Sequence, residues 1–91
     1  MMRKIKLTRA NKSILLKALA PYYYQQRVLG HSTQEVGKLI LKINALPADK
    51  KASFYAEEIF LMRSTINQLR NDQLAKGQYT DDVDDMLLKL I

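Results

Sequence analysis

Hydrophobic side chains recur every three to four positions along most of the chain, which is the spacing of one face of an α-helix. In the first such segment, apolar residues within 14–19 share one side, and basic and hydroxyl side chains lie opposite. Thr8 can cap the start of this helix, and Pro21 interrupts it because an interior proline lacks a backbone donor. The pattern predicts helices over residues 8–20 and 22–29.

Three further helices follow from capping and stop signals. Residues 32–35 read Ser-Thr-Gln-Glu, the form of a capping box, and predict a helix over 32–45 that stops before Pro47. The longest apolar seam, with gaps of three and four, predicts a third helix from about 48 to 75. A short C-terminal helix over 81–90 is expected, with four aspartates in or near its positively polarised first turn.

These elements predict an all-α fold, a compact four- or five-helix bundle that forms a single domain over residues 1–91. No period-two alternation typical of strands, no internal repeat and no linker is recognised, so no strand is expected. The long third helix offers a seam for a homodimer.

The composition agrees with one packed core in a reducing compartment. Apolar residues make up 47% of the 91 residues and charged residues 26%, which is a globular balance. Cysteine is absent, which excludes disulfides and thiolate metal sites and favours a cytoplasmic location. No secretory signal is expected because Lys17 interrupts the only candidate apolar run.

The net charge of +6 is distributed unevenly. Residues 1–34 carry seven basic side chains and no acid, whereas residues 81–91 carry four aspartates and one lysine. A basic region favours a polyanionic partner such as nucleic acid or anionic lipid. The alternative is that it pairs with the acidic C-terminal region inside the fold.

The residue types that catalysis requires are scarce. His31 is the only histidine and falls in a predicted loop, and the adjacent Glu57 and Glu58 diverge by about 100° on a helix. The four aspartates lack the spacing of a calcium loop. We therefore expect a protein that is not an enzyme and that uses no cofactor or metal.

Three consecutive tyrosines, residues 22–24, are the most unusual feature. Their rings spread over roughly 200° of a helix, so at least one should be exposed. An exposed tyrosine beside basic residues can form a hot spot for a protein partner. The candidate interaction face consists of Arg9, Lys12, Lys17, Tyr22, Tyr23, Tyr24 and Arg27.

A partial helix-turn-helix pattern spans residues 22–42, with Gly30 at the turn. The residue types before the glycine depart from that pattern, so the unit is degenerate. In this arrangement the candidate DNA contacts are Thr33, Gln34, Lys38 and Lys42.

The leading hypothesis is a small non-enzymatic protein-interaction module, of the physical type of inhibitors, immunity proteins and phage or plasmid accessory proteins, with an unidentified protein as its partner. One alternative is a small basic DNA-binding regulator that uses residues 22–42. Another is peripheral binding to an anionic membrane surface through residues 1–19.

Overall fold

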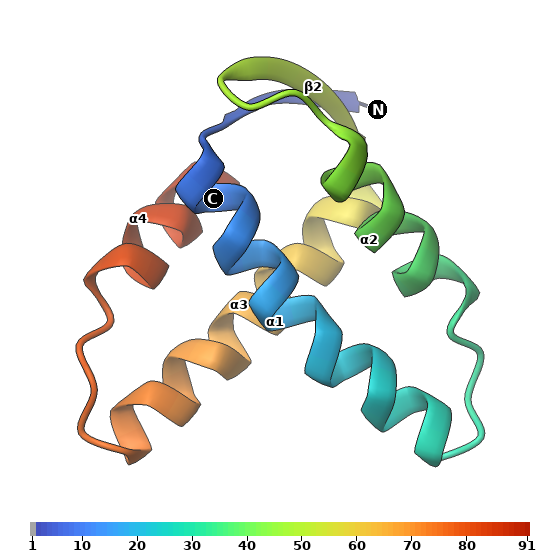
Figure 1. Ribbon diagram of the computed structural model, residues 1–91, viewed down its shortest axis with the longest axis vertical. Coiled ribbons are helices and arrows are strands. Elements are labelled where there is room, and N and C mark those ends of the chain that lie inside the picture. Colours follow the sequence, from blue (N-terminus) through green and yellow to red (C-terminus); the bar gives the residue numbers. More distant parts are fainter. Residues whose placement is uncertain (1) are drawn as a thin grey trace.

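The computed structural model describes residues 2–91 and arranges them as β-α-α followed by a second β-α-α (Figure 1). In chain order the elements are β1 (Met2–Leu7), α1 (Arg9–Val28), α2 (Gln34–Ala45), β2 (Lys50–Tyr55), α3 (Ala56–Ala75) and α4 (Asp81–Leu90). The two strands form one antiparallel sheet. The fold class is therefore α+β, and the prediction of an all-α bundle of four or five helices is wrong.

β1 was not expected, although its side chains alternate as those of a strand do. Ile5 and Leu7 are buried, whereas Lys4 and Lys6 are exposed. This alternation covers only a few residues, and the strand pairs with β2 in the other half of the chain instead of with a neighbouring hairpin partner. A short apolar alternation without a turn signal is a weak sequence signal for a strand.

The predicted third helix begins later than expected. The segment Lys50–Tyr55 forms β2, and only from Ala56 does α3 begin, so the prediction of a helix over 48–75 is wrong in its first eight residues. Asp49 lies in the turn before β2 with a φ of 64°, and its N–H donates to the Leu7 carbonyl over 2.8 Å. This bond joins the turn to the end of β1.

The chain contains an internal repeat, which corrects the expectation that it has none. A shift of 47 in residue number aligns residues 2–44, the first repeat, with residues 49–91, the second repeat, and this alignment matches the order of the elements. The pattern of buried and exposed positions in Gln34–Ile43 is identical to that in Asp81–Leu90. Seven residue types are the same in both repeats, at Lys4, Gln26, Gly30, Thr33, Val36, Leu41 and Lys42 and their counterparts 47 positions later.

The strand register agrees with a twofold relation between the repeats. Ile5 lies opposite Ala52, its own counterpart, so the pseudo-twofold axis passes between these two residues. Figure 1 shows the consequence: α1 and α3 cross beneath the strands, and α2 and α4 lie on opposite flanks. The molecule therefore has two similar but non-identical halves.

The core lies around the crossing helices and under the sheet, and both repeats contribute equivalent positions to it. Six apolar core residues of the first repeat have an apolar core counterpart in the second. The pairs are Leu7 with Phe54, Leu15 with Met62, Leu19 with Ile66, Val36 with Val83, Leu39 with Met86, and Ile43 with Leu90. Burial of each such side chain is worth about 1.5–3 kcal/mol, so this shared set of positions specifies the fold.

α1 is continuous through Pro21, so the prediction of separate helices over 8–20 and 22–29 is wrong at this point. Leu19 before the proline and Tyr22 after it both pack against the core, and this tertiary packing offsets the lost backbone hydrogen bond. The predicted start is confirmed, because the Thr8 hydroxyl accepts from the Asn11 N–H over 3.0 Å. Gly30 ends the helix region with a φ of 76°.

The apolar seam of the predicted third helix, now part of α3, packs against the core of the same molecule. Met62 and Ile66 are both fully buried in the core of the same molecule. Within residues 2–91, no helix combines the length and the apolar character required to cross a membrane.

Candidate nucleic-acid interface

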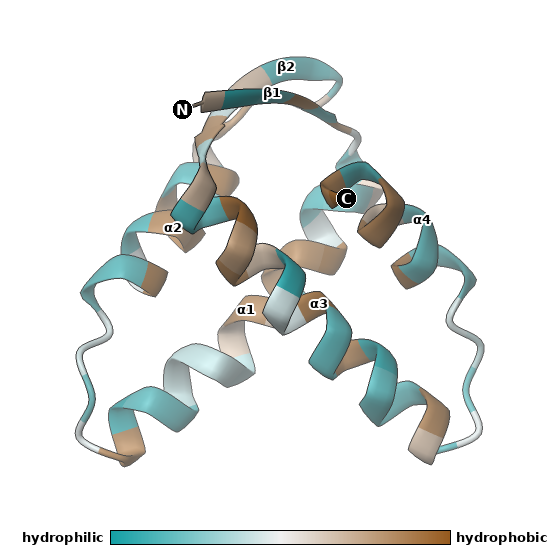
Figure 2. Ribbon diagram, turned by 180° about the vertical axis from the view of Figure 1, so that it is seen from behind, coloured by the Kyte–Doolittle hydropathy of each residue, from teal (hydrophilic) through white to brown (hydrophobic). Residues whose placement is uncertain are grey.

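The two paired strands form a ribbon, and one of its faces is open. Because side chains alternate along a strand, every second residue of β1 and β2 points away from the core. The outer face of the ribbon consists of Met2, Lys4, Lys6, Lys51, Ser53 and Tyr55. All six are exposed except Ser53, which is half-buried. Figure 2 shows the ribbon at one end of the molecule, with hydrophilic and hydrophobic residues both present along the strands.

Three lysines on the outer face lie close together. Lys6 stands directly opposite Lys51, and Lys4 stands opposite Ser53. Directly opposite residues have Cβ atoms about 4.5–5.5 Å apart, and like charges at such positions destabilise a sheet. These lysines therefore lower the stability of the ribbon, and charge retained at such a cost is typical of a surface that binds an opposite charge.

No acid within residues 2–91 neutralises these lysines. The ion pairs in this part of the chain are Lys42 with Glu58 at 2.9 Å and Arg70 with Asp84 at 2.6 Å. The outer face of the ribbon itself contains no acidic residue. The ribbon consequently presents three uncompensated positive charges.

Two equivalent lysines hold the ribbon on the helices. Lys42 at the end of α2 donates to the Ser53 carbonyl over 2.7 Å and to Glu58 over 2.9 Å. Its counterpart Lys89 in α4 donates to the Lys6 carbonyl over 3.2 Å. Each lysine thus ties the last helix of one repeat to the strand of the other.

The acceptors of these lysines also cap the helices that follow the strands. Glu58 accepts from the Tyr55 N–H over 2.8 Å, and its counterpart Asn11 accepts from the Thr8 N–H over 3.0 Å. Asn11 additionally accepts from Lys89 over 2.6 Å. Because the same side chain fixes the strand-to-helix joint and receives the anchoring lysine, the ribbon is held in one orientation.

The DNA contacts expected from the helix-turn-helix pattern are not all available on one surface. Gln34 and Lys38 are exposed on α2 and Thr33 is half-buried at its start, but Lys42 is engaged with Glu58 and Ser53. The same helix-loop-helix geometry recurs in α3 and α4. There, Asp81 and Asp85 occupy the positions of Gln34 and Lys38.

The basic residues of the expected interaction face spread along α1. Arg9 is exposed beside the ribbon, Lys17 is exposed near the middle of the helix, and Arg27 is exposed at its far end. A helix of 20 residues is about 30 Å long, so these charges act at separate places. Lys12 donates to the carbonyl of Leu46 and is occupied in holding the end of α2.

The tyrosines divide between the core and the surface. Tyr22 and Tyr23 are half-buried and pack against the core, whereas Tyr24 is 63% exposed, which confirms that at least one ring is exposed. The Tyr23 and Tyr24 rings are 5.5 Å apart at 84°. They lie in the part of α1 that follows Pro21, away from the ribbon (Figure 1).

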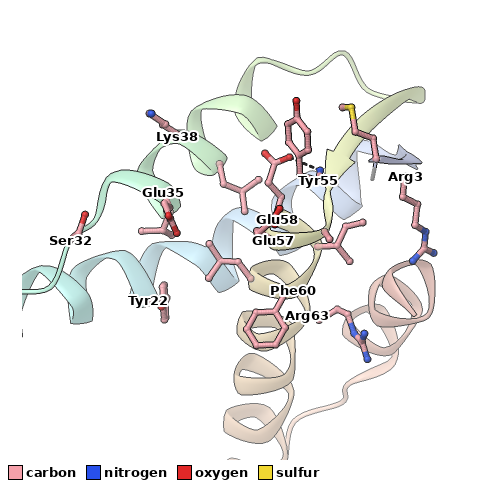
Figure 3. A pocket seen from close by; sticks show the side chains of 16 residues that line it. Arg3, Tyr22, Ser32, Glu35, Lys38, Tyr55, Glu57, Glu58, Phe60 and Arg63 are labelled. Carbon is pink, nitrogen blue, oxygen red and sulfur yellow. Dashed lines mark hydrogen bonds between the residues drawn. The ribbon is translucent and has the colours of Figure 1, made fainter.

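A groove of about 1220 Å³ lies between α2 and the first half of α3 (Figure 3). Val36, Leu39 and Ile59 contribute apolar lining, and Phe60 at its border is 72% exposed. Charged side chains of both signs surround it, namely Glu35, Lys38, Glu57 and Arg63. The sequence pattern gives no sign of this groove because its two walls come from different repeats.

The acidic start of α4 is partly tied down by its own fold. Asp84 accepts from Arg70 Nε over 2.6 Å and from the Thr80 hydroxyl over 2.9 Å. The hydrogen bond from Arg70, followed by that from Thr80, lowers the pKa of this carboxyl. No cluster of three or more histidine, cysteine, aspartate or glutamate side chains within residues 2–91 is arranged to hold a metal ion.

Comparison with protein-family models, curated proteins and solved structures finds no match. Function is therefore inferred from the geometry of the molecule.

Proposed function

We propose that the protein is a cytoplasmic, non-enzymatic DNA-binding protein that places its ribbon in the major groove of duplex DNA. One observation carries this proposal: Lys4, Lys6 and Lys51 share the open face of a two-stranded antiparallel ribbon and have no ion-pair partner within residues 2–91. The DNA-binding alternative from the sequence is thus favoured, but on a different element from the one expected.

The dimensions of the ribbon suit the major groove. That groove is about 12 Å wide and admits a two-stranded β-ribbon, whose strands are about 4.8 Å apart. Six residues at about 3.3 Å each make the ribbon about 20 Å long. Lysine side chains on such a ribbon reach guanine O6 and N7 atoms or neighbouring phosphates. The net charge of +6 additionally speeds encounter with DNA.

Lysines on exposed strands also prevent edge-to-edge pairing between molecules. Such a protective role requires no affinity for DNA. It also does not require two lysines to face each other directly, as Lys6 and Lys51 do. Measurement of DNA binding by ribbon variants separates the two roles.

The test is fluorescence anisotropy of a labelled duplex of mixed sequence, titrated between about 50 and 200 mM salt. Replacing Lys4, Lys6 and Lys51 by alanine should weaken binding at least about tenfold and reduce the salt slope by up to about 2.7, at about 0.9 per lost charge contact. The matched control replaces three exposed basic residues elsewhere, Lys17, Arg27 and Lys76. Circular dichroism verifies that both variants are folded.

Equal loss in the two triple variants would reject the ribbon as the site and leave only a general charge effect. If Gln34→Ala with Lys38→Ala weakens binding and the ribbon variant does not, the helix-turn-helix alternative is favoured instead. A parallel titration with anionic vesicles tests the membrane alternative. Wild-type binding to vesicles without binding to duplex would contradict the DNA proposal.

A second candidate function, a protein-interaction module, is favoured by the groove between α2 and α3. Phe60 is 72% exposed beside an apolar lining, and exposed aromatic residues are common anchors in protein interfaces. If this function operates, Phe60→Glu abolishes capture of a specific host protein and leaves DNA affinity unchanged. Capture that persists with this variant rejects the groove as the docking site.

A further inference from the structure

The pseudo-twofold axis through the ribbon relates positions that differ chemically. On the outer face, Lys4 is equivalent to Lys51, but Lys6 is equivalent to Ser53. A protein with two identical halves reads a palindromic site, because each half contacts the same bases on either side of the axis. This chain has the geometry for such a site without the matching side chains.

We propose that the ribbon recognises a non-palindromic DNA sequence and binds it in a single orientation. This inference rests on the proposed DNA-binding function. The equivalent lysines Lys4 and Lys51 would select the same base on each side of the axis. Lys6 would select a base on its side of the axis, and Ser53 would leave the symmetric position unconstrained.

The chemistry of the two differing residues gives a defined preference. Lysine donates to guanine O6 and N7, whereas the serine hydroxyl both donates and accepts and tolerates any base. A guanine is therefore preferred at the step that Lys6 reaches, and its symmetric counterpart near Ser53 is unconstrained. A well-formed contact of the first kind discriminates about 5- to 150-fold against the wrong base.

The charges beside the ribbon also differ between the repeats, and the first repeat is again the more basic one. Arg9 and Ala10 begin α1, and their counterparts Ala56 and Glu57 begin α3; all four are exposed. In sequence, the first repeat holds nine basic residues and one acidic residue, and the second holds six basic and eight acidic residues. Phosphates near the start of α1 are thus attracted more strongly than those near the start of α3, which adds a second preference for one orientation.

Selection of duplexes from a random pool by the wild-type protein tests the sequence preference. The expected consensus has no twofold symmetry. Ser53→Lys should introduce the missing guanine preference and make the consensus more symmetric, and Lys6→Ser should do so by removing the existing one. Circular dichroism verifies that each variant is folded. The two changes are independent, so if one variant does not fold, the other still tests the proposal.

Orientation is measured with a tethered cleavage reagent, since the chain has no cysteine of its own and a single introduced cysteine is unique. The matched sites are Ala10→Cys and Glu57→Cys, which are equivalent exposed positions next to the ribbon. On a selected duplex, each variant should cut one side of the site, and the two variants should cut opposite sides.

The outcomes separate this inference from the function on which it rests. A palindromic consensus, a pool without any enriched sequence, or equal cutting on both sides by either cysteine variant would overturn the single-orientation site while DNA binding stands. Absence of any duplex binding by the wild-type protein would overturn the proposed function itself.

Discussion

The direct opposition of Lys6 and Lys51 predicts that the wild-type ribbon is less stable than it could be. Replacing Lys51 by glutamate converts a like-charge pair into an opposite-charge pair. Directly opposite cross-strand pairs contribute about 0.2–1 kcal/mol each, and both side chains are exposed, so we expect a gain of about 0.5–1 kcal/mol at low salt. For a domain of this size the melting temperature should rise by about 2–8 °C.

The control is Lys50→Glu, one residue earlier. Lys50 lies opposite Leu7 and belongs to the other side of the ribbon, because a shift of one residue reverses the face. Both variants lower the net charge from +6 to +4, so a general reduction of self-repulsion affects them equally. The difference between them reports the pairing with Lys6.

The assay is thermal and urea unfolding followed by circular dichroism at low and at high salt. The advantage of Lys51→Glu should disappear near 1 M salt, where the Debye length is about 3 Å. The double variant Lys6→Glu with Lys51→Glu restores a like-charge pair and should lose the gain. If Lys51→Glu is no more stable than Lys50→Glu at low salt, the two lysines do not face each other and the register is wrong.

Three further predictions concern the core, the loops and the acidic helix. Phe54→Ala removes a fully buried ring beneath the ribbon and should destabilise the protein by about 3–5 kcal/mol in urea unfolding; a loss below 1 kcal/mol would show that this ring is not in the core. Gly30→Ala and Gly77→Ala place a side chain at φ of 76° and 69° and should each cost about 1–2 kcal/mol, with similar values because the loops are equivalent. Asp84 has a lowered pKa in the folded state, so its ionised carboxylate contributes to the free energy of unfolding above about pH 4, and this contribution is lost as pH falls through the folded pKa. Asp84→Asn should therefore flatten the decline of the unfolding free energy below about pH 4. An unchanged dependence of stability on acid pH would refute this.

The helix ends were predictable because local chemistry determines them. Gly30 and Gly77 adopt the positive φ that glycine permits, and α2 ends at Ala45, before Pro47, as expected. The capping box expected at residues 32–35 does not form: α2 begins at Gln34, and Thr33 makes no side-chain capping hydrogen bond. The C-terminal helix expected over 81–90 coincides with α4, whose buried residues include Val83. These features depend on residues within a few positions of one another.

The strands were missed because their pairing depends on the other half of the chain. Ala52 and Tyr55 fit the helical seam that continues into α3, and only the partner strand shows that Ala52 and Phe54 line the inner side of a ribbon while Tyr55 lies on its outer face. A helical pattern was therefore extended across residues 50–55. Tertiary pairing overrode the local propensity.

The repeat could have been recognised from the sequence. Gly30, Thr33 and Val36 recur as a glycine, a threonine and a valine 47 positions later, around similar apolar spacing. Only seven identical residue pairs connect the repeats, so the relation is visible mainly as a repeated burial pattern. Recognition of this spacing would have predicted that residues 2–7 and 50–55 adopt the same structure, and it would have placed Lys4 and Lys51 at equivalent positions.

The most direct test of the ribbon as a DNA-binding surface is a two-dimensional NMR titration of the isotope-labelled protein with duplex DNA. If the ribbon binds DNA, the largest amide shifts fall in β1 and β2 and at the start of α1, around Arg9. Amides of Glu35, Lys38 and Phe60, which line the groove from α2 and α3, should change little. Shifts concentrated at Tyr22–Tyr24 or along α2, with the ribbon unchanged, would contradict DNA binding by the ribbon.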